Sequence, residues 1–252
     1  EAFKKQGAVT MMADEVHDNC QSPTSVLHAL TTEAFWLDPK DMPDHQMWRL
    51  YCSPHVPPCC WASRGFLNPG RRQCVGGGRE LHDVVISYLE QWLGMYSSAP
   101  RRFASVNTMV AHEHFMFRLN ALDDALSSLF LRLEADVLQD TVLFLLSDHG
   151  THGIWYNDYE IGATEHKLPM LYVVAPDWLM KDRPTWLHAL RDNQHRLVTP
   201  RDVYTAIMQL AAYPNVYEFE AREHSLFETI SAKRTCSDAG IPEQFCACRR
   251  VV

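Results

Sequence analysis

The feature that most constrains the fold is an apolar run at residues 142–147 that ends abruptly in polar residues. The run, VLFLLS, is partly β-branched and does not alternate between apolar and polar positions, a pattern typical of a strand buried on both faces of a parallel sheet. Asp148, His149 and Gly150 follow it directly. Open α/β sheets bind their ligands at the carboxyl ends of the strands. The sequence therefore predicts an α/β domain with a polar site at this edge of the sheet.

Asp148 and His149 are candidate metal ligands. A carboxylate oxygen beside an imidazole nitrogen suits a divalent cation, with zinc favoured by the ligand types and calcium or manganese as alternatives. Gly150 lets the backbone turn away without a Cβ clash. The structural alternative is that Asp148 caps a loop and His149 makes a half-buried polar contact, because short motifs often occur without a site.

The rest of the chain alternates between strand and helix patterns. We expect further strands at 8–13, 102–110 and 169–175, and helices at 79–96, 119–138 and 200–212, where Thr199 is the expected N-cap. Residues 51–78 are rich in Cys, Pro and Gly and predict an insertion in the form of a long loop. The expected organisation is one α/β domain over 1–212, with helices on both faces of its sheet, and an irregular cysteine-containing tail at 213–252 that packs on it.

Two histidines are candidate catalytic residues. His112 follows the strand predicted at 102–110, and His166 lies just before the strand predicted at 169–175. Imidazoles near one edge of a sheet can bind a tetrahedral anion or protonate a leaving group, a contribution of about 10²–10⁴-fold in rate. The alternative for His112 is a surface polar cluster that includes His114.

Eight cysteines, at 20, 52, 59, 60, 74, 236, 246 and 248, lie in the predicted loops and the tail. A zinc site is the competing interpretation, but the spacing lacks a Cys-x-x-Cys pair. We therefore expect disulfides, which form in an oxidising compartment.

Charge and hydropathy narrow the choice of partners. The net charge of −8 argues against nucleic acid and anionic membrane surfaces, which need a basic footprint. No window approaches the roughly eighteen continuous apolar residues of a membrane span. Because the chain starts at Glu1 with no signal sequence, we expect a signal peptide or an anchor upstream.

The segment around Asp148 resembles a known superfamily. The motif Ser147-Asp148-His149-Gly150 after a strand, then Gly162-x-x-Glu165-His166-x-x-Pro169 and another apolar strand, is similar to the carboxyl half of the alkaline-phosphatase superfamily, most closely its sulfatase-like members. The Glu-x-x-Leu-Pro segment, the Arg-Leu-x-Thr before the helix at 200 and the cysteine-bearing tail resemble secreted or membrane-anchored eukaryotic sulfatase-like domains of unknown function. This resemblance implies an αβα sandwich with a mainly parallel sheet, truncated at its amino-terminal end.

The resemblance also implies roles for individual residues. Asp148 and His149 would bind the active-site metal, and His112 occupies the position of a histidine that touches the substrate phosphate in related phosphoethanolamine transferases. The match there is partial, since Glu113 replaces an Asp and Ala111 a Ser. The superfamily's metal-binding acid on the first strand and its nucleophile at the next helix have no counterpart before Glu1, so we expect that part to be missing from this chain.

Two functions from different classes are consistent with these patterns. The first is a metal-dependent, sulfatase-like hydrolase or transferase of phosphate or sulfate esters. It would act on an anionic ester, on a glycan or a lipid, in the extracellular space or the secretory-pathway lumen. The second is a non-catalytic extracellular domain that retains the alkaline-phosphatase-like fold for binding or architecture. Enzymatic activity depends on a nucleophile supplied by the missing part.

Overall fold

The computed structural model describes residues 1–15, 42–47, 77–108, 110–111, 118–150, 156–219 and 223–248. They belong to two compact units, the first made mainly of residues 3–133 and the second of residues 134–150 and 157–252. Residues 51–76 of the predicted insertion, and the cysteines at 20, 52, 59, 60 and 74, lie outside the described ranges. None of the helices described is both long and apolar enough to cross a membrane.

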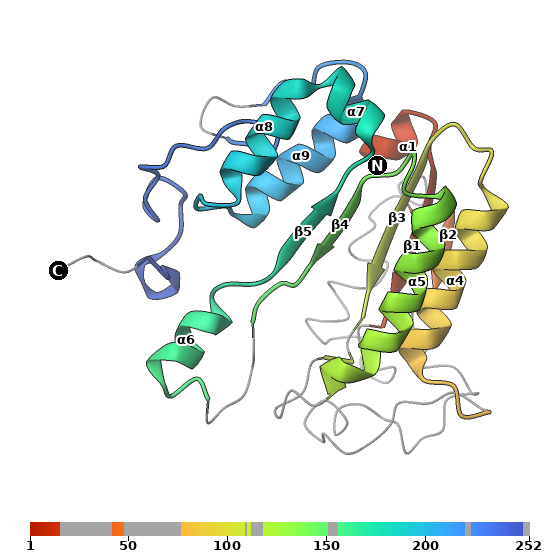
Figure 1. Ribbon diagram of the computed structural model, residues 1–252, viewed down its shortest axis with the longest axis horizontal. Coiled ribbons are helices and arrows are strands. Elements are labelled where there is room, and N and C mark those ends of the chain that lie inside the picture. Colours follow the sequence, from red (N-terminus) through yellow and green to blue (C-terminus); the bar gives the residue numbers. More distant parts are fainter. Residues whose placement is uncertain are drawn as a thin grey trace. The chain divides into compact units, whose positions relative to one another are not determined.

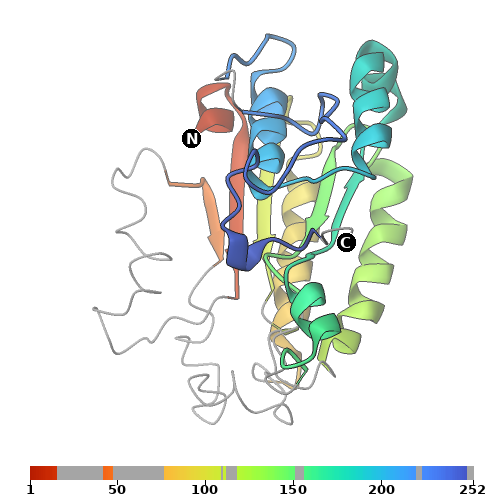
Figure 2. The same cartoon turned by 90° about the vertical axis from the view of Figure 1, so that its left-hand side faces the viewer.

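The first unit contains a three-stranded parallel sheet in the order β2-β1-β3 (Figures 1 and 2). Its elements are α1 (Ala2–Lys5), β1 (Val9–Asp14), β2 (His45–Met47), α4 (Leu81–Met95), β3 (Arg102–Asn107), a 3-10 turn (Arg118–Leu122) and α5 (Asp123–Asp136). The strands and helices predicted in this region are confirmed: β1 is shifted by one residue, and β3, α4 and α5 are shorter than predicted. Parallel strands joined through helices make this an α/β arrangement, as the sequence predicted.

The core of this unit forms where β1 and α4 meet. Met11 and Ala13 of β1 are buried, as are Leu81 and Val85 of α4, and α4 contacts β1. The apolar residues of α4 recur at helical spacing, so one face of the helix is covered while the opposite face carries polar side chains.

Asp44 ties the entry of β2 to β1. Its carboxylate accepts hydrogen bonds from the Thr10 amide at 2.9 Å and the Thr10 hydroxyl at 2.8 Å, and the Lys4 ammonium lies 3.1 Å away. Burial raises the pKa of Asp44, but the Thr10 hydrogen bonds and Lys4 outweigh it and hold that pKa below its usual value. The charged carboxylate therefore stabilises this corner of the sheet.

The second unit contains a two-stranded antiparallel ribbon (Figure 1), formed by β4 (Leu143–Leu146) and β5 (Leu171–Val174). Leu143 pairs with Val174, and Leu146 pairs with Leu171. The prediction that residues 142–147 form a strand is confirmed, but the predicted parallel pairing is wrong for its described partner. Full burial is also wrong, since 49% of Leu146 is exposed. An apolar run without alternation does not specify its partner's direction, which depends on where the connecting segment returns.

Helices α7 (Asp177–Asp182), α8 (Pro184–Asn193) and α9 (Pro200–Ala212) follow the ribbon. Val203 and Ala206 of α9 form the core of this unit with Leu226 and Phe227. Packed against that core are ribbon and helix side chains: Phe144, Leu171, Val173, Trp186, Leu190, Val198, Ile207 and Leu210. Leu171 and Val173 are covered while Tyr172 and Val174 are exposed, the period-two pattern of a strand with one buried face.

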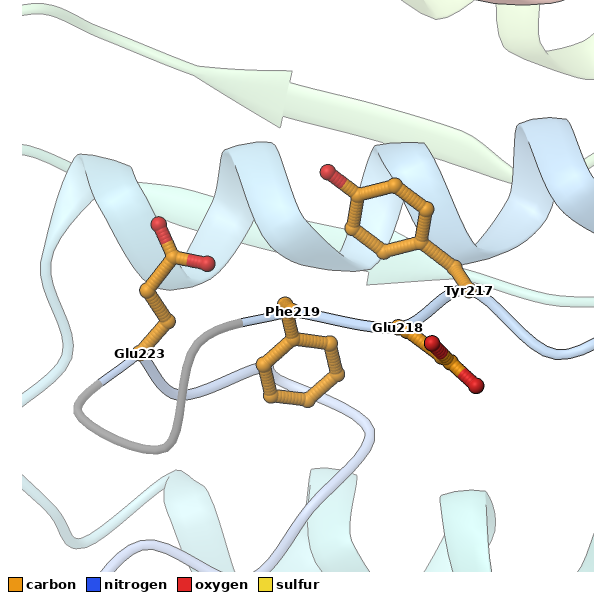
Figure 3. A pocket seen from close by; sticks show the side chains of 4 residues that line it. All are labelled: Tyr217, Glu218, Phe219 and Glu223. Atoms are coloured by element: carbon orange, nitrogen blue, oxygen red, sulfur yellow. The ribbon is translucent and has the colours of Figure 1, made fainter.

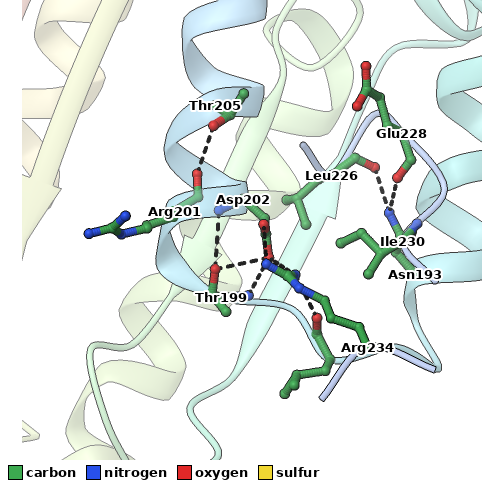
Figure 4. A network of polar contacts seen from close by, with 10 residues as sticks. Asn193, Thr199, Arg201, Asp202, Thr205, Leu226, Glu228, Ile230 and Arg234 are labelled. Atoms are coloured by element: carbon green, nitrogen blue, oxygen red, sulfur yellow. Dashed lines mark hydrogen bonds and ion pairs between the residues drawn. The ribbon is translucent and has the colours of Figure 1, made fainter. Parts of the chain in front are cut away.

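Two polar networks fix residues 225–234 against α8 and α9 (Figure 4). The buried Asn193 amide donates to the carbonyls of Leu226 at 3.0 Å and Glu228 at 2.8 Å, and its oxygen accepts from the Ile230 amide at 2.9 Å. A single side chain thereby satisfies three backbone groups of an irregular segment, which has no ladder of its own.

The second network is a buried ion pair at the start of α9. Arg234 donates to both carboxylate oxygens of Asp202, at 2.7 and 3.2 Å, and to the Leu197 carbonyl at 3.0 Å (Figure 4). Thr199 caps α9 in a capping box with Asp202, which confirms the predicted N-cap. Both charged side chains are buried, at 7% exposure for Arg234 and 1% for Asp202.

The tail contains a short disulfide-closed loop. Cys236 and Cys246 are joined across ten residues, and a 3-10 turn (Glu243–Phe245) precedes the second cysteine. The prediction of disulfides is confirmed for this pair. This bond closes a loop within the tail, and the contacts of Asn193 and Arg234 attach the tail to the helices.

Candidate metal centre

The antiparallel ribbon brings two predicted sites together. Asp148 and His149 follow β4, while His166 ends α6 (Glu160–His166), just before β5. In an antiparallel pair, the end of one strand lies beside the start of the next. Backbone hydrogen bonds between the two segments continue beyond the strands. The Ser147 amide donates to the Met170 carbonyl at 3.2 Å, and the Gly150 amide donates to the His166 carbonyl at 3.0 Å. The two histidines meet because the pairing is antiparallel.

Gly150 makes this close approach possible. A Cβ built at this position would lie 2.1 Å from the Glu165 carbonyl oxygen and 3.1 Å from the His166 Cα. These are backbone atoms, which cannot move aside as a flexible side chain could. Glycine is therefore required here by contact with the α6 terminus, a more specific reason than the sharp turn expected from the sequence.

Asp148 and His149 present their donor atoms to the same side. His149 Nε2 lies 3.7 Å from Asp148 Oδ2, with 88% of the Asp148 side chain and 31% of the His149 side chain exposed. Asp148 Oδ1 accepts a hydrogen bond from the His149 amide at 3.0 Å, which holds the carboxylate beside the ring. The pair is therefore reachable from solvent.

The His149 ring is oriented by its other nitrogen. Nδ1 lies 2.7 Å from the Gly150 carbonyl oxygen, and since a carbonyl only accepts hydrogen bonds, Nδ1 is the donor. In the neutral ring, Nε2 then carries the lone pair. Metal-binding histidines are typically oriented in this way, with the second ring nitrogen donating to a backbone carbonyl or a carboxylate.

The donor spacing is consistent with one shared cation. Two bonds of about 2.1 Å across a 3.7 Å separation give an angle of about 125° at the ion, within the range of a distorted tetrahedral zinc site. The two residues therefore fit a divalent metal. Across the described ranges, no further His, Cys, Asp or Glu completes a three-donor cluster around this pair. Asp148 and His149 could thus supply only part of a coordination shell.

His166 lies beside this pair. Its ring centroid is 4.9 Å from that of His149, with the planes inclined at 47°. Of the other predicted residues, His112 lies outside the described part of the chain, so its position near this edge remains a prediction.

A three-donor cluster that the sequence analysis set aside lies in the tail. The sulfur atoms of Cys236, Cys246 and Cys248 are all within 4.8 Å of one another. Three thiolates could bind a metal ion, but Cys236 and Cys246 form a disulfide, whose sulfurs are not thiolates. The sequence lacks the Cys-x-x-Cys pair typical of a zinc site, and the Cys246-Ala247-Cys248 spacing is its one signal of this cluster.

A surface hollow follows α9, lined by Tyr217, Glu218, Phe219 and Glu223 (Figure 3). The Tyr217 and Phe219 rings are stacked, with centroids 6.2 Å apart. Burial, together with the neighbouring Tyr204 and the negative charge of Glu223, raises the pKa of Tyr217. The hollow contains none of the predicted site residues.

Comparison with known proteins gives one match. Residues 61–252 match the model of a family described as "Protein of unknown function (DUF229)", which is sulfatase-like. No curated protein and no solved structure matches the chain. The matched region covers most of the chain and includes Asp148, His149 and His166, so the chain belongs to the DUF229 family.

Proposed function

We propose that this protein is a metal-dependent hydrolase or transferase of phosphate or sulfate esters, with Asp148 and His149 as two of its metal ligands. The observation that carries this proposal is the geometry of the pair: Nε2 and Oδ2 lie 3.7 Å apart, and the Gly150 carbonyl fixes the ring. Membership of a sulfatase-like family supports the reaction class. Zinc suits the ligand types best, with calcium or manganese as alternatives.

When bound, the metal would polarise the ester oxygens and lower the pKa of a nucleophile. Asp148 and His149 would hold the ion, and the hydrogen bond from Nδ1 to the Gly150 carbonyl would keep Nε2 directed at it. No residue of this chain is assigned as the nucleophile.

His166 would contact the substrate. Its ring is adjacent to His149, so an anion held at the metal would lie within its reach. There it could donate a hydrogen bond to the tetrahedral group or a proton to the leaving oxygen, a role that contributes about 10²–10⁴-fold in rate. We propose the same class of role for His112.

The second candidate is a non-catalytic extracellular domain that retains the alkaline-phosphatase-like fold for binding or architecture. The set of metal ligands among the described residues is incomplete, which supports a domain without catalytic activity. Under both candidates we place the protein outside the cytosol, since the Cys236–Cys246 disulfide is stable in an oxidising compartment.

Metal content and turnover of 4-nitrophenyl phosphate and 4-nitrophenyl sulfate, measured on the full-length protein, test both candidates. The enzyme proposal predicts turnover that is lost in Asp148→Ala and His149→Ala and retained in Asp192→Ala, a matched control on the exposed face of α8. Bound metal without turnover of either ester would favour the non-catalytic candidate. Turnover that is unchanged in Asp148→Ala would remove the basis for the enzyme proposal.

A further inference from the structure

The three tail cysteines combine a disulfide with a third sulfur. Cys236 and Cys246 are bonded, Cys248 carries a free and exposed thiol, and all three Sγ atoms lie within 4.8 Å of one another. The cluster belongs to the second unit and contains none of the residues proposed to bind the metal.

This juxtaposition suits thiol–disulfide exchange. A thiolate attacks one sulfur of a disulfide, forms a new S–S bond with it and releases the other sulfur as a thiolate. Access to the attacking thiol governs reactivity, and Cys248 is exposed. Only Ala247 separates Cys246 from Cys248, so both sulfurs belong to one short segment within 4.8 Å of Cys236.

The surroundings of the disulfide indicate which sulfur is attacked. Cys236 is 8% exposed, so attack on Cys246 would release a thiolate at the buried Cys236, where desolvation opposes the charge. Attack on Cys236 instead releases the thiolate at Cys246, which is only partly buried. The second direction is therefore favoured.

Cys236 is also the anchored end of the pair. It follows the ion-paired Arg234, and its carbonyl accepts a hydrogen bond from the Ile241 amide at 2.8 Å. The next turn is fixed by the Asp238 carboxylate, which accepts from the Thr235 amide at 2.9 Å and hydroxyl at 2.7 Å. Cys236 thus stays in place while its partner can change.

We propose that Cys236, Cys246 and Cys248 form a thiol–disulfide exchange site. The Cys248 thiolate attacks Cys236 Sγ, the Cys236–Cys248 bond forms, the Cys236–Cys246 bond breaks, and the electron pair and negative charge pass to Cys246. No external oxidant or reductant is needed, because one disulfide and one thiol are present before and after the step. The tail therefore alternates between two disulfide pairings and always presents one reactive thiol.

Thiol mapping on the full chain tests this proposal. The protein, purified without reductant, is incubated at about pH 8, where about a quarter of ordinary thiols are ionised. It is then quenched with acid and labelled with a maleimide, and the labelled positions are located by tandem mass spectrometry. The expected result is label on both Cys248 and Cys246, with Cys236 unlabelled. Label on Cys248 alone, label on Cys236, or a disulfide between Cys248 and a cysteine other than Cys236 would overturn the proposal.

Two substitutions separate exchange from incomplete oxidation. In Cys248→Ser the structural disulfide is kept and the attacking thiol is removed, so the label on Cys246 is expected to disappear. In Cys246→Ser, Cys248 is expected to form a disulfide with Cys236. Label that persists on Cys246 in the first variant, or free thiols at both remaining positions in the second, would contradict the exchange step.

Discussion

The buried Arg234–Asp202 ion pair gives the sharpest prediction about stability. In Arg234→Met, the carboxylate of Asp202 would lose two hydrogen bonds of 2.7 and 3.2 Å and the Leu197 carbonyl would lose one of 3.0 Å, at a site where both charged side chains are almost fully buried. Removal of one partner from a buried ion pair costs about 3–5 kcal/mol, because the remaining charge is left uncompensated. Thr199 still donates its amide and hydroxyl to Asp202, at 2.7 and 3.0 Å, so we expect a loss near the lower end, about 3 kcal/mol.

The assay is urea unfolding followed by tryptophan fluorescence, with Arg201→Met as the control. Arg201 lies on the same helix with an exposed side chain, so its substitution should change the free energy of unfolding by less than about 0.5 kcal/mol. The double variant Arg234→Met with Asp202→Asn should be less destabilised than the sum of the two single variants, because it leaves no buried charge. A loss below about 1 kcal/mol in Arg234→Met would refute the assignment of the pair as the anchor of the tail.

Three further predictions concern individual contacts. Gly150→Ala should lower the free energy of unfolding by about 1–3 kcal/mol, because the added Cβ would clash with the backbone of Glu165. The control Gly94→Ala, in open space on α4, should raise the free energy of unfolding by up to about 1 kcal/mol in the same urea assay. Equal effects of the two substitutions would contradict the clash. Asn193→Ala leaves three backbone groups without their hydrogen-bond partner and should lower the free energy of unfolding in urea by about 2–4 kcal/mol. A decrease of less than about 1 kcal/mol would contradict this role of Asn193. The lowered pKa of Asp44 means that its contribution is complete above the unfolded pKa near 3.8 and is lost as the pH falls through the lower folded pKa. Acid titration followed by circular dichroism should therefore show a shallower loss of stability in Asp44→Asn, and an unchanged acid limb would show that this carboxylate is not linked to folding.

Local signals in the sequence identified most elements of secondary structure. The apolar spacing at 79–96 predicted α4, and Thr199 followed by Pro200 predicted the start of α9 with its cap. Such features depend on residues three or four positions apart, which the sequence shows directly. The Asp148-His149-Gly150 motif likewise marked the end of β4.

Features that depend on distant residues were harder to predict. The direction of β5 relative to β4 is set by the path of residues 147–170, which no periodicity encodes. The roles of Asn193 and Arg234 were missed because each side chain joins a helix to an irregular segment more than thirty residues away in the sequence. The proximity of Cys248 to the Cys236–Cys246 disulfide was also hard to predict, because it depends on how residues 236–248 fold.

The most direct test of the central proposal is anomalous diffraction from crystals of the protein grown with zinc, with Cys248→Ser as the background so that the tail thiol cannot compete. The proposal predicts a peak about 2.0–2.2 Å from both His149 Nε2 and Asp148 Oδ2, which disappears in Asp148→Ala and persists in Asp192→Ala. A zinc ion bound elsewhere, with no density between these two atoms, would contradict the assignment of Asp148 and His149 as metal ligands.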